Sequence, residues 1–485
     1  MFNFTKQTKK SPVNIITTVS VLNELQVKYS EKDEPSPLLQ PLSPASAAKQ
    51  VSTESLVAVT ANENNAKLVL LAPTPTTIKE SGLSASLLLD LVVKHLQIAG
   101  VYTLRELSEK LALTGSIVQI LIEKAKTLAW IENRQSTNDG QMRYCLSHLG
   151  NLQADKAFMK NGYLGCAPLP LAEYIRVAKI QSSRAAPLSK PELDAAFEHL
   201  TFPEELIEKI GPALNSTKPI LIYGKAGTGK SYFCRHLNLV FGDQVLIPYA
   251  IEVNNEIIQI FDPEVHHTSL QTDHRDSLKL NSRFDGRWQL CKRPLIITGG
   301  ELTLDMLEIS FDRNTKVYKA PIQLKANNGI LLLDDLGRQK VSPKALFNRW
   351  IVPLEERRDF LSLQSGLHFE VPFELLMLFS TNLSPNELID DAFLRRLGYK
   401  ILFLGLDKQQ FKDIWEQECR AQGLHCENEI FEHLINDFLI INDKDFLPCY
   451  PRDLLSIIRD QVVFKDLPEI VTKDLLNFAW QSYFV

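Results

Sequence analysis

The chain has 485 residues, of which 45% are hydrophobic, and a formal net charge of −5 at pH 7. Since this length exceeds one ordinary core, we expect two or three folded units. The slightly acidic balance excludes a global basic field of the kind that holds nucleic acid non-specifically. No apolar run approaches the roughly 20 residues that a membrane helix needs, and the seven cysteines have no metal-binding spacing. We therefore expect a cytoplasmic protein without membrane insertion.

Residues 1–84 are dominated by Ser, Thr, Pro, Ala and Asn. Tracts of this composition bury too little apolar surface to fold, so we predict a disordered, low-complexity arm that acts as a spacer. Two short apolar pieces, residues 13–19 and 68–71, leave open the alternative that parts of the arm become ordered on a partner.

Residues 85–153 show helical and then strand periodicity, and we predict a separate domain here. The expected helices span 86–100, 103–112 and 116–128, and the expected strands span 130–134 and 142–147. Three helices followed by a β-hairpin resemble a winged-helix domain. In that resemblance, the helix that begins at Ser116 is the candidate recognition helix.

The charges on this predicted domain bear on its partner. Between Ser116 and Glu132, two acidic and two basic residues cancel. A helix that reads bases normally brings phosphate-neutralising Lys or Arg with it. The sequence therefore favours docking to a protein, and DNA binding remains the less favoured alternative.

Residues 154–203 are predicted to be a connector with a helix near 171–181, and the main domain follows it. Residues 219–223 form an apolar strand that runs into a Gly-rich loop and then a helix. The loop matches GxxxxGK[ST] in the context that gives the motif its meaning. We expect its backbone N–H groups to face the phosphates of ATP, with Lys230 at the β and γ phosphates and the Ser231 hydroxyl on Mg²⁺. The predicted nucleotide-binding residues of the loop are Gly224, Lys225, Ala226, Gly227, Thr228, Gly229, Lys230 and Ser231.

The apolar run 329–333 ends in two carboxylates, Asp334 and Asp335. A central parallel strand reads as continuous apolar sequence, so we expect this strand to lie beside the strand at 219–223. Asp334 is the candidate Mg²⁺ ligand, together with Ser231. Asp335 is placed where a general base for the attacking water belongs.

A further apolar strand, 373–379, is followed by Asn382, whose amide could orient the attacking water. Two adjacent arginines, Arg395 and Arg396, come next. They could form a solvated helix end, but their position after Asn382 favours a role at the nucleotide.

This ordered set of motifs resembles the AAA+ superfamily of P-loop ATPases over roughly residues 200–485. In that resemblance, Asn382 is sensor 1, Arg396 and then Arg395 are the arginine-finger candidates, and Arg452 is sensor 2 over the nucleotide. The stretches around 325–335 and 343–356 are similar to MoxR-like, helix-2-insert and enhancer-binding members. Residues 299–306 and 380–396 look like a group of bacterial AAA ATPases, a resemblance that implies relatives and no particular activity.

The resemblance implies an α/β fold. We expect an AAA+ α/β nucleotide-binding subdomain at 204–406 and an α-helical lid subdomain at 407–485, preceded by the winged-helix-like domain and the arm. It also implies a ring of identical subunits, often a hexamer, in which an arginine finger reaches the nucleotide of a neighbour. An arginine in that position can contribute about 10³ to 10⁵ in rate.

Two departures qualify this resemblance. The position of Asp335 usually carries Glu, and the shorter side chain predicts slow hydrolysis if it lies too far from the water. Residues 263–294 form a polar, His-rich interruption, which we interpret as a solvated insertion. Metal binding by its histidines is the less favoured alternative, because no tetrahedral ligand set is complete.

These observations leave three hypotheses for function. The leading one is an ATPase that couples ATP binding and hydrolysis to remodelling of a protein, or nucleoprotein, client. The second is a nucleotide-gated scaffold with little hydrolysis, and the third is a DNA-linked regulator that uses the winged-helix-like domain. The sequence does not identify the client.

Overall fold

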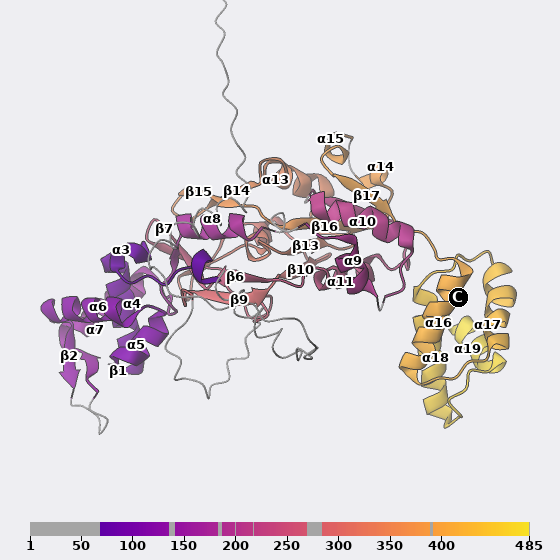
Figure 1. Cartoon of the computed structure of the whole chain (residues 1–485), viewed down its shortest axis with the longest axis horizontal. Coiled ribbons are helices and arrows are strands. Elements are labelled where there is room, and N and C mark those ends of the chain that lie inside the picture. The colour runs from indigo at the N-terminus through magenta and orange to yellow at the C-terminus, as the bar shows by residue number, and fades with distance from the viewer. Residues whose placement is uncertain are drawn as a thin grey trace, which may run out of the picture. The chain divides into compact units, whose positions relative to one another are not determined.

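The computed structural model describes residues 68–134, 141–182, 187–198, 200–216, 218–268, 284–388 and 391–484. Figure 1 labels their elements, which alternate helices and strands up to β17 and continue as helices. The predicted arm up to residue 67 and the segment 269–283 of the predicted insertion lie outside the described residues. No helix of the described part is both long and apolar enough to cross a membrane.

A five-stranded parallel sheet carries the motifs of the main domain. Its order is β10-β13-β16-β5-β17, with β10 at Leu295–Thr298, β13 at Ile330–Leu333, β16 at Leu376–Thr381, β5 at Ile220–Tyr223 and β17 at Tyr399–Leu402. The apolar runs at 219–223, 329–333 and 373–379 therefore predicted three of its strands correctly in type. All four residues of β13 are buried, as expected for a strand that is covered on both faces.

The predicted neighbours within the sheet were wrong. The strand that ends before Asp334 does not lie beside β5, because β16 lies between them. An apolar run reports that a strand is buried, but crossover connections in a parallel sheet can skip positions, so it does not report the strand's neighbours. As a result, Asn382 follows β16, which lies between β13, the strand before Asp335, and β5, the strand before the loop that contains Lys230.

Helices cover both faces of this sheet, because alternate strand residues point to opposite sides. One core joins residues such as Ile330 and Leu332 to α9 (Lys190–Phe197), α10 (Glu204–Ser216) and α11 (Lys230–His236). The other core joins Leu331 and Leu333 to α13 (Pro343–Glu356). The helix after the Gly-rich loop is shorter than its sequence suggested, since a 3₁₀ turn at Leu237–Leu239 follows α11.

A second set of strands lies between α11 and β13 in the sequence, and we call it the insertion. It contains an antiparallel pair, β6 (Gln244–Pro248) with β9 (Trp288–Lys292), and most of a five-stranded sheet of order β11-β12-β8-β7-β4. The strands of that sheet are β7 (Ala250–Val253), β8 (Glu256–Gln259), β11 (Ser310–Asp312), β12 (Val317–Lys319) and, from the predicted connector, β4 (Leu169–Pro170). The interpretation of 263–294 as a solvated loop was wrong for its last part, because Trp288–Lys292 forms β9 and Asp285, Arg287 and Trp288 are buried.

The N-terminal helical domain has the predicted elements. Its helices are α4 (Ala85–Ala99), α5 (Leu104–Leu111) and α6 (Gly115–Thr127), and its strands are β1 (Tyr102–Thr103), β2 (Ile131–Arg134) and β3 (Arg143–Leu146). The three strands form one sheet of order β1-β3-β2. A further helix, α7 (His148–Lys160), packs against α4 and was not predicted.

Two predicted boundaries differ from the structure. Residues 68–84, which the sequence placed in the arm, include α3 (Ile78–Ser81) and the buried side chains of Ala72 and Leu83. The predicted connector contributes β4, α8 (Leu171–Ile180) and α9 to folded cores. The helix predicted near 171–181 corresponds to α8. In residues 68–84 apolar residues occur singly among Pro, Ser and Thr, so their burial leaves no periodic signal.

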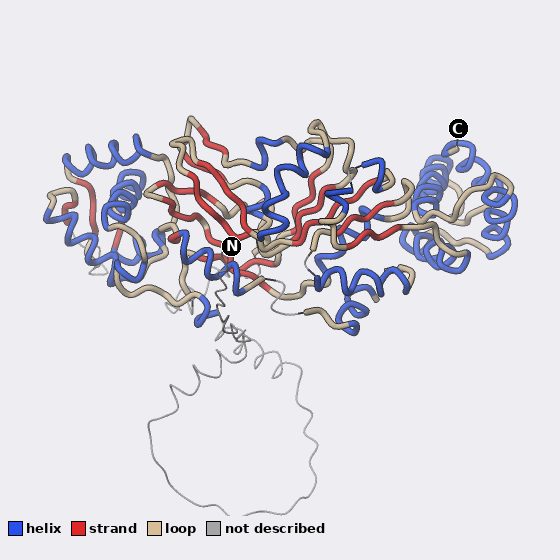
Figure 2. The backbone as a smooth tube through the Cα atoms, turned by 90° about the horizontal axis from the view of Figure 1, so that it is seen from above, coloured by secondary structure: helices blue, strands red, loops and turns tan. Residues whose placement is uncertain are grey.

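The residues after β17 form helices with a separate core. These are α16 (Lys408–Gln422), α17 (Asn428–His433), a π-helical stretch (Leu434–Ile440), α18 (Cys449–Lys465) and α19 (Lys473–Tyr483). Figure 2 shows this cluster in blue and tan without strands, whereas the red strands belong to the preceding domains. We refer to these elements as the C-terminal helices. The remaining hairpin, β14 (Arg358–Ser362) with β15 (His368–Pro372), packs on the core of the insertion.

The start of β13 is held by a buried polar network. Arg293 donates from Nη1 to the backbone oxygen of Asn328 over 2.7 Å, and the Asn328 amide donates to the backbone oxygen of Ala178 over 2.7 Å. Gln181 donates to Oδ1 of Asn328 over 3.0 Å. Asn328 is in the left-handed region at φ 62°, which Asn tolerates better than most residues. The network ties β13 to α8 and to the loop before β10.

Candidate functional site

The Gly-rich loop connects β5 to α11 and depends on its glycines. Gly224 has φ 148°, and a Cβ there would lie 2.2 Å from the backbone oxygen of Phe403. Gly227 has φ 83°, and a Cβ there would lie 2.6 Å from Sγ of Cys449 in α18. Only glycine combines these dihedral angles with such close approach. The loop is therefore packed against both β17 and the C-terminal helices.

Lys230 is buried and its ammonium group has three close acceptors. It donates to the backbone oxygens of Gly224 (2.9 Å) and Lys225 (2.8 Å) and to Oδ1 of Asn382 (2.8 Å). Burial lowers the pKa of Lys230, and the nearby carboxylates of Asp334 and Asp335 oppose this effect. A buried cation of this kind gains free energy from an anion placed beside it.

One hydrogen bond connects the loop to a strand end, and a second connects two strand ends. The Ser231 hydroxyl donates to Oδ1 of Asp334 over 3.0 Å. The Asn382 amide donates to Oδ1 of Asp335 over 3.2 Å, while its own oxygen accepts from Lys230. Lys230, Asn382 and Asp335 thus form a continuous chain of hydrogen bonds across three strand ends. The sequence predicted these residues together, but not that Asn382 would bridge the other two.

Asp335 has a left-handed backbone conformation with φ 51°. Asp and Asn are enriched in this region, whereas longer or branched residues are rarer. The turn is held by Gln339, whose amide donates to the backbone oxygen of Asp334 over 3.0 Å. The conformation gives a physical reason for a short carboxylate at this position.

A cavity of about 840 Å³ lies over the loop. The site residues predicted from the sequence that line this cavity are Ala226, Gly227, Thr228, Gly229, Lys230, Ser231, Asp335, Asn382 and Arg452. An adjoining cavity of about 670 Å³ is lined by Gly224, Lys225 and Asn382 among others. The first cavity is also lined by two arginines that were not predicted from the sequence, Arg235 and Arg338. Arg235 lies in the helix after the loop and Arg338 lies three residues after Asp335, so proximity to these motifs was the available signal.

The C-terminal helices contribute directly to this cavity. Arg452 on α18 lines it, with most of its side chain exposed and a hydrogen bond of 3.2 Å to Asp453. Lys225 of the loop forms an ion pair with Asp445, just before α18. The sequence did not predict this pair, because Asp445 belongs to no recognisable motif.

The two arginine-finger candidates lie elsewhere. They follow α15 (Asp391–Leu394), and Arg396 forms an ion pair of 2.5 Å with Glu355 at the end of α13. The Arg395 side chain is exposed. Within the described residues, neither arginine lines the cavity of its own chain.

The histidines of the insertion do not form a metal site in the described part of the chain. His266 is buried and hydrogen-bonded to the backbone oxygen of Lys325 over 2.8 Å and to the Asp262 amide over 2.9 Å. His267 is exposed, and His274 lies outside the described residues. His266 therefore has a structural environment.

The residues around the loop fit a nucleoside triphosphate with Mg²⁺. The glycines leave backbone where a Cβ would clash, Lys230 supplies a buried cation, and Ser231 with Asp334 supplies hard oxygen ligands of the kind that Mg²⁺ prefers. Asn382 and Asp335 supply an amide and a carboxylate on the same side.

One protein family matches part of the chain. A family model described as a domain of unknown function, DUF8689, matches residues 407–482, which cover the C-terminal helices except the last residue of α19. No curated protein sequence matches the chain.

Several solved structures overlap the chain in part. The RuvB Holliday junction branch migration motor of Thermotoga maritima has a TM-score of 0.33 at 13% identity, over 59% of this chain and 70% of that chain. NtrX from Brucella abortus has a TM-score of 0.36 at 12% identity, over 57% and 54%. A BchI–BchD complex of magnesium chelatase has a TM-score of 0.28 at 14% identity, over 61% and 92%. Similarity of this size does not transfer an activity.

Proposed function

We propose that this chain is a P-loop ATPase of the AAA+ type that binds ATP with Mg²⁺. The observation that supports the proposal best is the chain of hydrogen bonds from Lys230 through Asn382 to Asp335, next to the pair of Ser231 and Asp334. It connects a phosphate-binding lysine, a polar amide and a carboxylate base candidate at adjacent strand ends. The cavity over them has the size of a nucleotide site.

In this proposal each residue has a defined role. The loop from Gly224 to Ser231 binds the phosphates, and Ser231 and Asp334 would hold Mg²⁺, which neutralises phosphate charge when bound. Asn382 orients a water, and Asp335 accepts its proton. Arg452 closes over the nucleotide from α18.

We further propose that ATP binding and hydrolysis drive remodelling of a protein client by a ring of subunits in the cytoplasm. Because neither Arg395 nor Arg396 lines the cavity of its own chain, a contribution from either one has to come from a neighbouring subunit. The insertion and the N-terminal helical domain are the parts of the chain available to contact a client.

The experiment that tests ATP use compares Lys230→Ala with Lys344→Ala, an exposed lysine on α13. Titration calorimetry should show loss of ATP affinity in the first variant, and phosphate release should fall by about 10² or more. Lys344→Ala should match the wild type in both measurements. Unchanged phosphate release in Lys230→Ala would refute the proposal.

A nucleotide-gated scaffold with little hydrolysis is the second candidate, and the short Asp335 side chain favours it. If the carboxylate is too distant from the water, Asp335→Glu should raise turnover, although Glu fits φ 51° less well. Asp335→Asn keeps the backbone preference and the contact to Asn382, and serves as the control. Wild-type turnover of about 1 s⁻¹ or faster would exclude the scaffold.

A further inference from the structure

Residues 71–83, which we call the strap, lie between the N-terminal helical domain and the insertion. Ala72 belongs to the core of the insertion. Leu83 belongs to the core of the helical domain, which Ala250, Ile257 and Val317 of the insertion also join. Ile78, on the one-turn helix α3, packs against the second core as well. The strap therefore buries apolar side chains on both sides, which a passive linker does not do.

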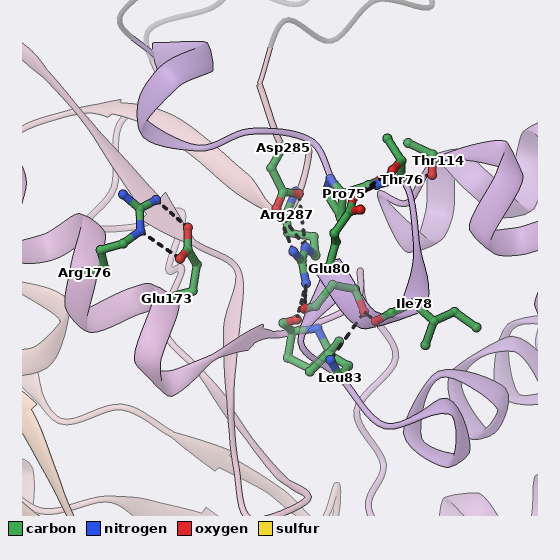
Figure 3. Close-up of polar contacts among 12 residues, drawn as sticks. Pro75, Thr76, Ile78, Glu80, Leu83, Thr114, Glu173, Arg176, Asp285 and Arg287 are labelled. Atoms are coloured by element: carbon green, nitrogen blue, oxygen red, sulfur yellow. Dashed lines mark hydrogen bonds and ion pairs between the residues drawn. The ribbon is translucent and has the colours of Figure 1, made fainter. Parts of the chain in front are cut away.

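A buried ion pair fastens the strap to the insertion. Arg287 and Asp285 pair over 2.8 Å, and each side chain is 3% exposed. Nη1 of Arg287 donates to the backbone oxygens of Ser81 (2.9 Å) and Pro168 (3.2 Å), and the Asp285 amide donates to the backbone oxygen of Ala72 (2.9 Å). Figure 3 shows Arg287 in this position, beside Asp285 and the strap.

The planar guanidinium of Arg287 has several N–H donors, which explains why its ion pair with Asp285 can be buried. Asp285 neutralises Arg287 through Nε and Nη2, so Nη1 remains for the two backbone oxygens. A buried charge whose donors are satisfied in this way specifies one arrangement of its partners. The outer end of the strap is held too, because Arg176 of α8 donates to the backbone oxygen of Leu71.

The middle of the strap is hydrogen-bonded to the start of α6. The Thr114 hydroxyl donates to the backbone oxygen of Pro75 over 3.1 Å, and the Ser116 hydroxyl donates to that of Thr76 over 3.2 Å. Figure 3 shows Thr114 next to Pro75 and Thr76. Ser116 itself stays exposed, so these two bonds hold the strap to this end of α6 without covering the helix.

We propose that the strap is a built-in fastening that fixes the helical domain to the insertion. The helical domain then moves as one body with the insertion. The contacts that carry this inference lie outside the proposed nucleotide site, so it stands or falls independently of ATP hydrolysis.

The test uses two glycines with positive φ in the full chain. Gly82 has φ 71° and ψ 8°, and a Cβ there would lie 2.5 Å from Cγ of Pro170. Gly100 has φ 79° and ψ −47°, with nothing within 4 Å of a Cβ. Alanine is strained at both positions, and more so at Gly100, which lies outside the left-handed helical region. Only Gly82→Ala should also push the strap off the insertion, so Gly100→Ala is the matched control.

Hydrogen exchange followed by mass spectrometry is the measurement. We expect amides of the strap, of 114–118 and of 284–288 to exchange about tenfold faster in Gly82→Ala, as for a local opening. The same amides should be unchanged in Gly100→Ala. Wild-type strap amides that exchange as fast as an unfolded peptide, or equal effects of both variants, would overturn the proposal.

A gentler variant tests the contact with α6. Thr114→Val combined with Ser116→Ala removes both hydroxyl donors, and Thr114 makes no side-chain capping bond to α6. Exchange at residues 76–78 should rise, while the buried helix α4 keeps its protection; unchanged exchange at 76–78 would count against the proposal.

Discussion

Gly227 is the residue at which the Gly-rich loop comes closest to the C-terminal helices. Its Cα faces Cys449 so closely that one added carbon would lie 2.6 Å from the sulfur. The position also needs a positive φ, which glycine adopts without strain. The loop can therefore report the position of α18 through contact alone.

We expect Gly227→Ala to weaken ATP binding by at least about tenfold, because both the backbone strain and the contact with Cys449 oppose the loop conformation. Adding Cys449→Ala removes the sulfur and should restore part of the affinity for ATP. The loss that remains is then due to backbone strain at residue 227. Calorimetric titration of both variants and of Cys449→Ala alone separates the two causes. No recovery in the double variant would mean that the contact is unimportant.

At the scale of elements, α4 contains a buried lysine whose charge affects stability. Lys94 donates to the backbone oxygen (2.7 Å) and side-chain oxygen (2.6 Å) of Asn161. Burial lowers the pKa of Lys94 to about 8, while nearby Asp90 raises it. The unfolded chain, with an ordinary lysine pKa, then binds more protons than the folded chain above about pH 8.

The free energy of unfolding should therefore rise as the pH increases from about 8 to about 10, by about 1 to 2 kcal/mol from this residue. Urea midpoints measured across that range should show the rise in the wild type and in Lys110→Met, an exposed lysine on α5. Lys94→Met should lose this component of the slope. An identical slope in all three proteins would contradict the assignment.

The strands show which parts of the fold could be predicted from the sequence. Apolar runs predicted β5, β13 and β16 because each strand is buried on both faces. The GxxxxGK[ST] pattern predicted where the Gly-rich loop lies between a strand and a helix. Neighbour order escaped prediction, since nothing in a run of Leu and Ile encodes which strand lies beside it. The insertion escaped for a different reason: its strands have three to five residues, too few for a clear period.

The contacts that depend on distant residues were not predictable either. Asp445 and Arg287 are ordinary charged residues in the sequence, and their partners Lys225 and Ser81 are far along the chain. By contrast, Ser231 and Asp334 were expected together, and the structure places them 3.0 Å apart. Recognisable motifs predict which residues meet at a site. A pair between residues outside any motif becomes visible only in the folded structure.

At the scale of the whole molecule, the proposed ring requires that one subunit completes the site of another. Arg396 is paired with Glu355 within its own chain, so it would have to exchange this partner to reach a neighbour. Such an exchange costs little free energy, because a half-exposed pair contributes little to stability.

Mixing two inactive variants tests this requirement. Lys230→Ala subunits keep Arg396 but should not bind ATP, whereas Arg396→Ala subunits should bind ATP without the finger. We expect each alone to release phosphate at least about 10²-fold more slowly than the wild type, and the mixture to recover a measurable part. The same mixture with Arg395→Ala identifies which arginine acts. A mixture no more active than its components would exclude a shared site.

The two ends of β13 have contrasting surroundings. At its start, Asn328 is held by Arg293 and Gln181, and past its end Asp334 accepts from Ser231. The strand itself has four residues, about 13 Å of extended backbone. Extended chain hardly stretches, and β13 is paired along its length with β10 and β16. The sheet therefore holds Asp334 at a fixed spacing from α8, which lies at the other end of the strand.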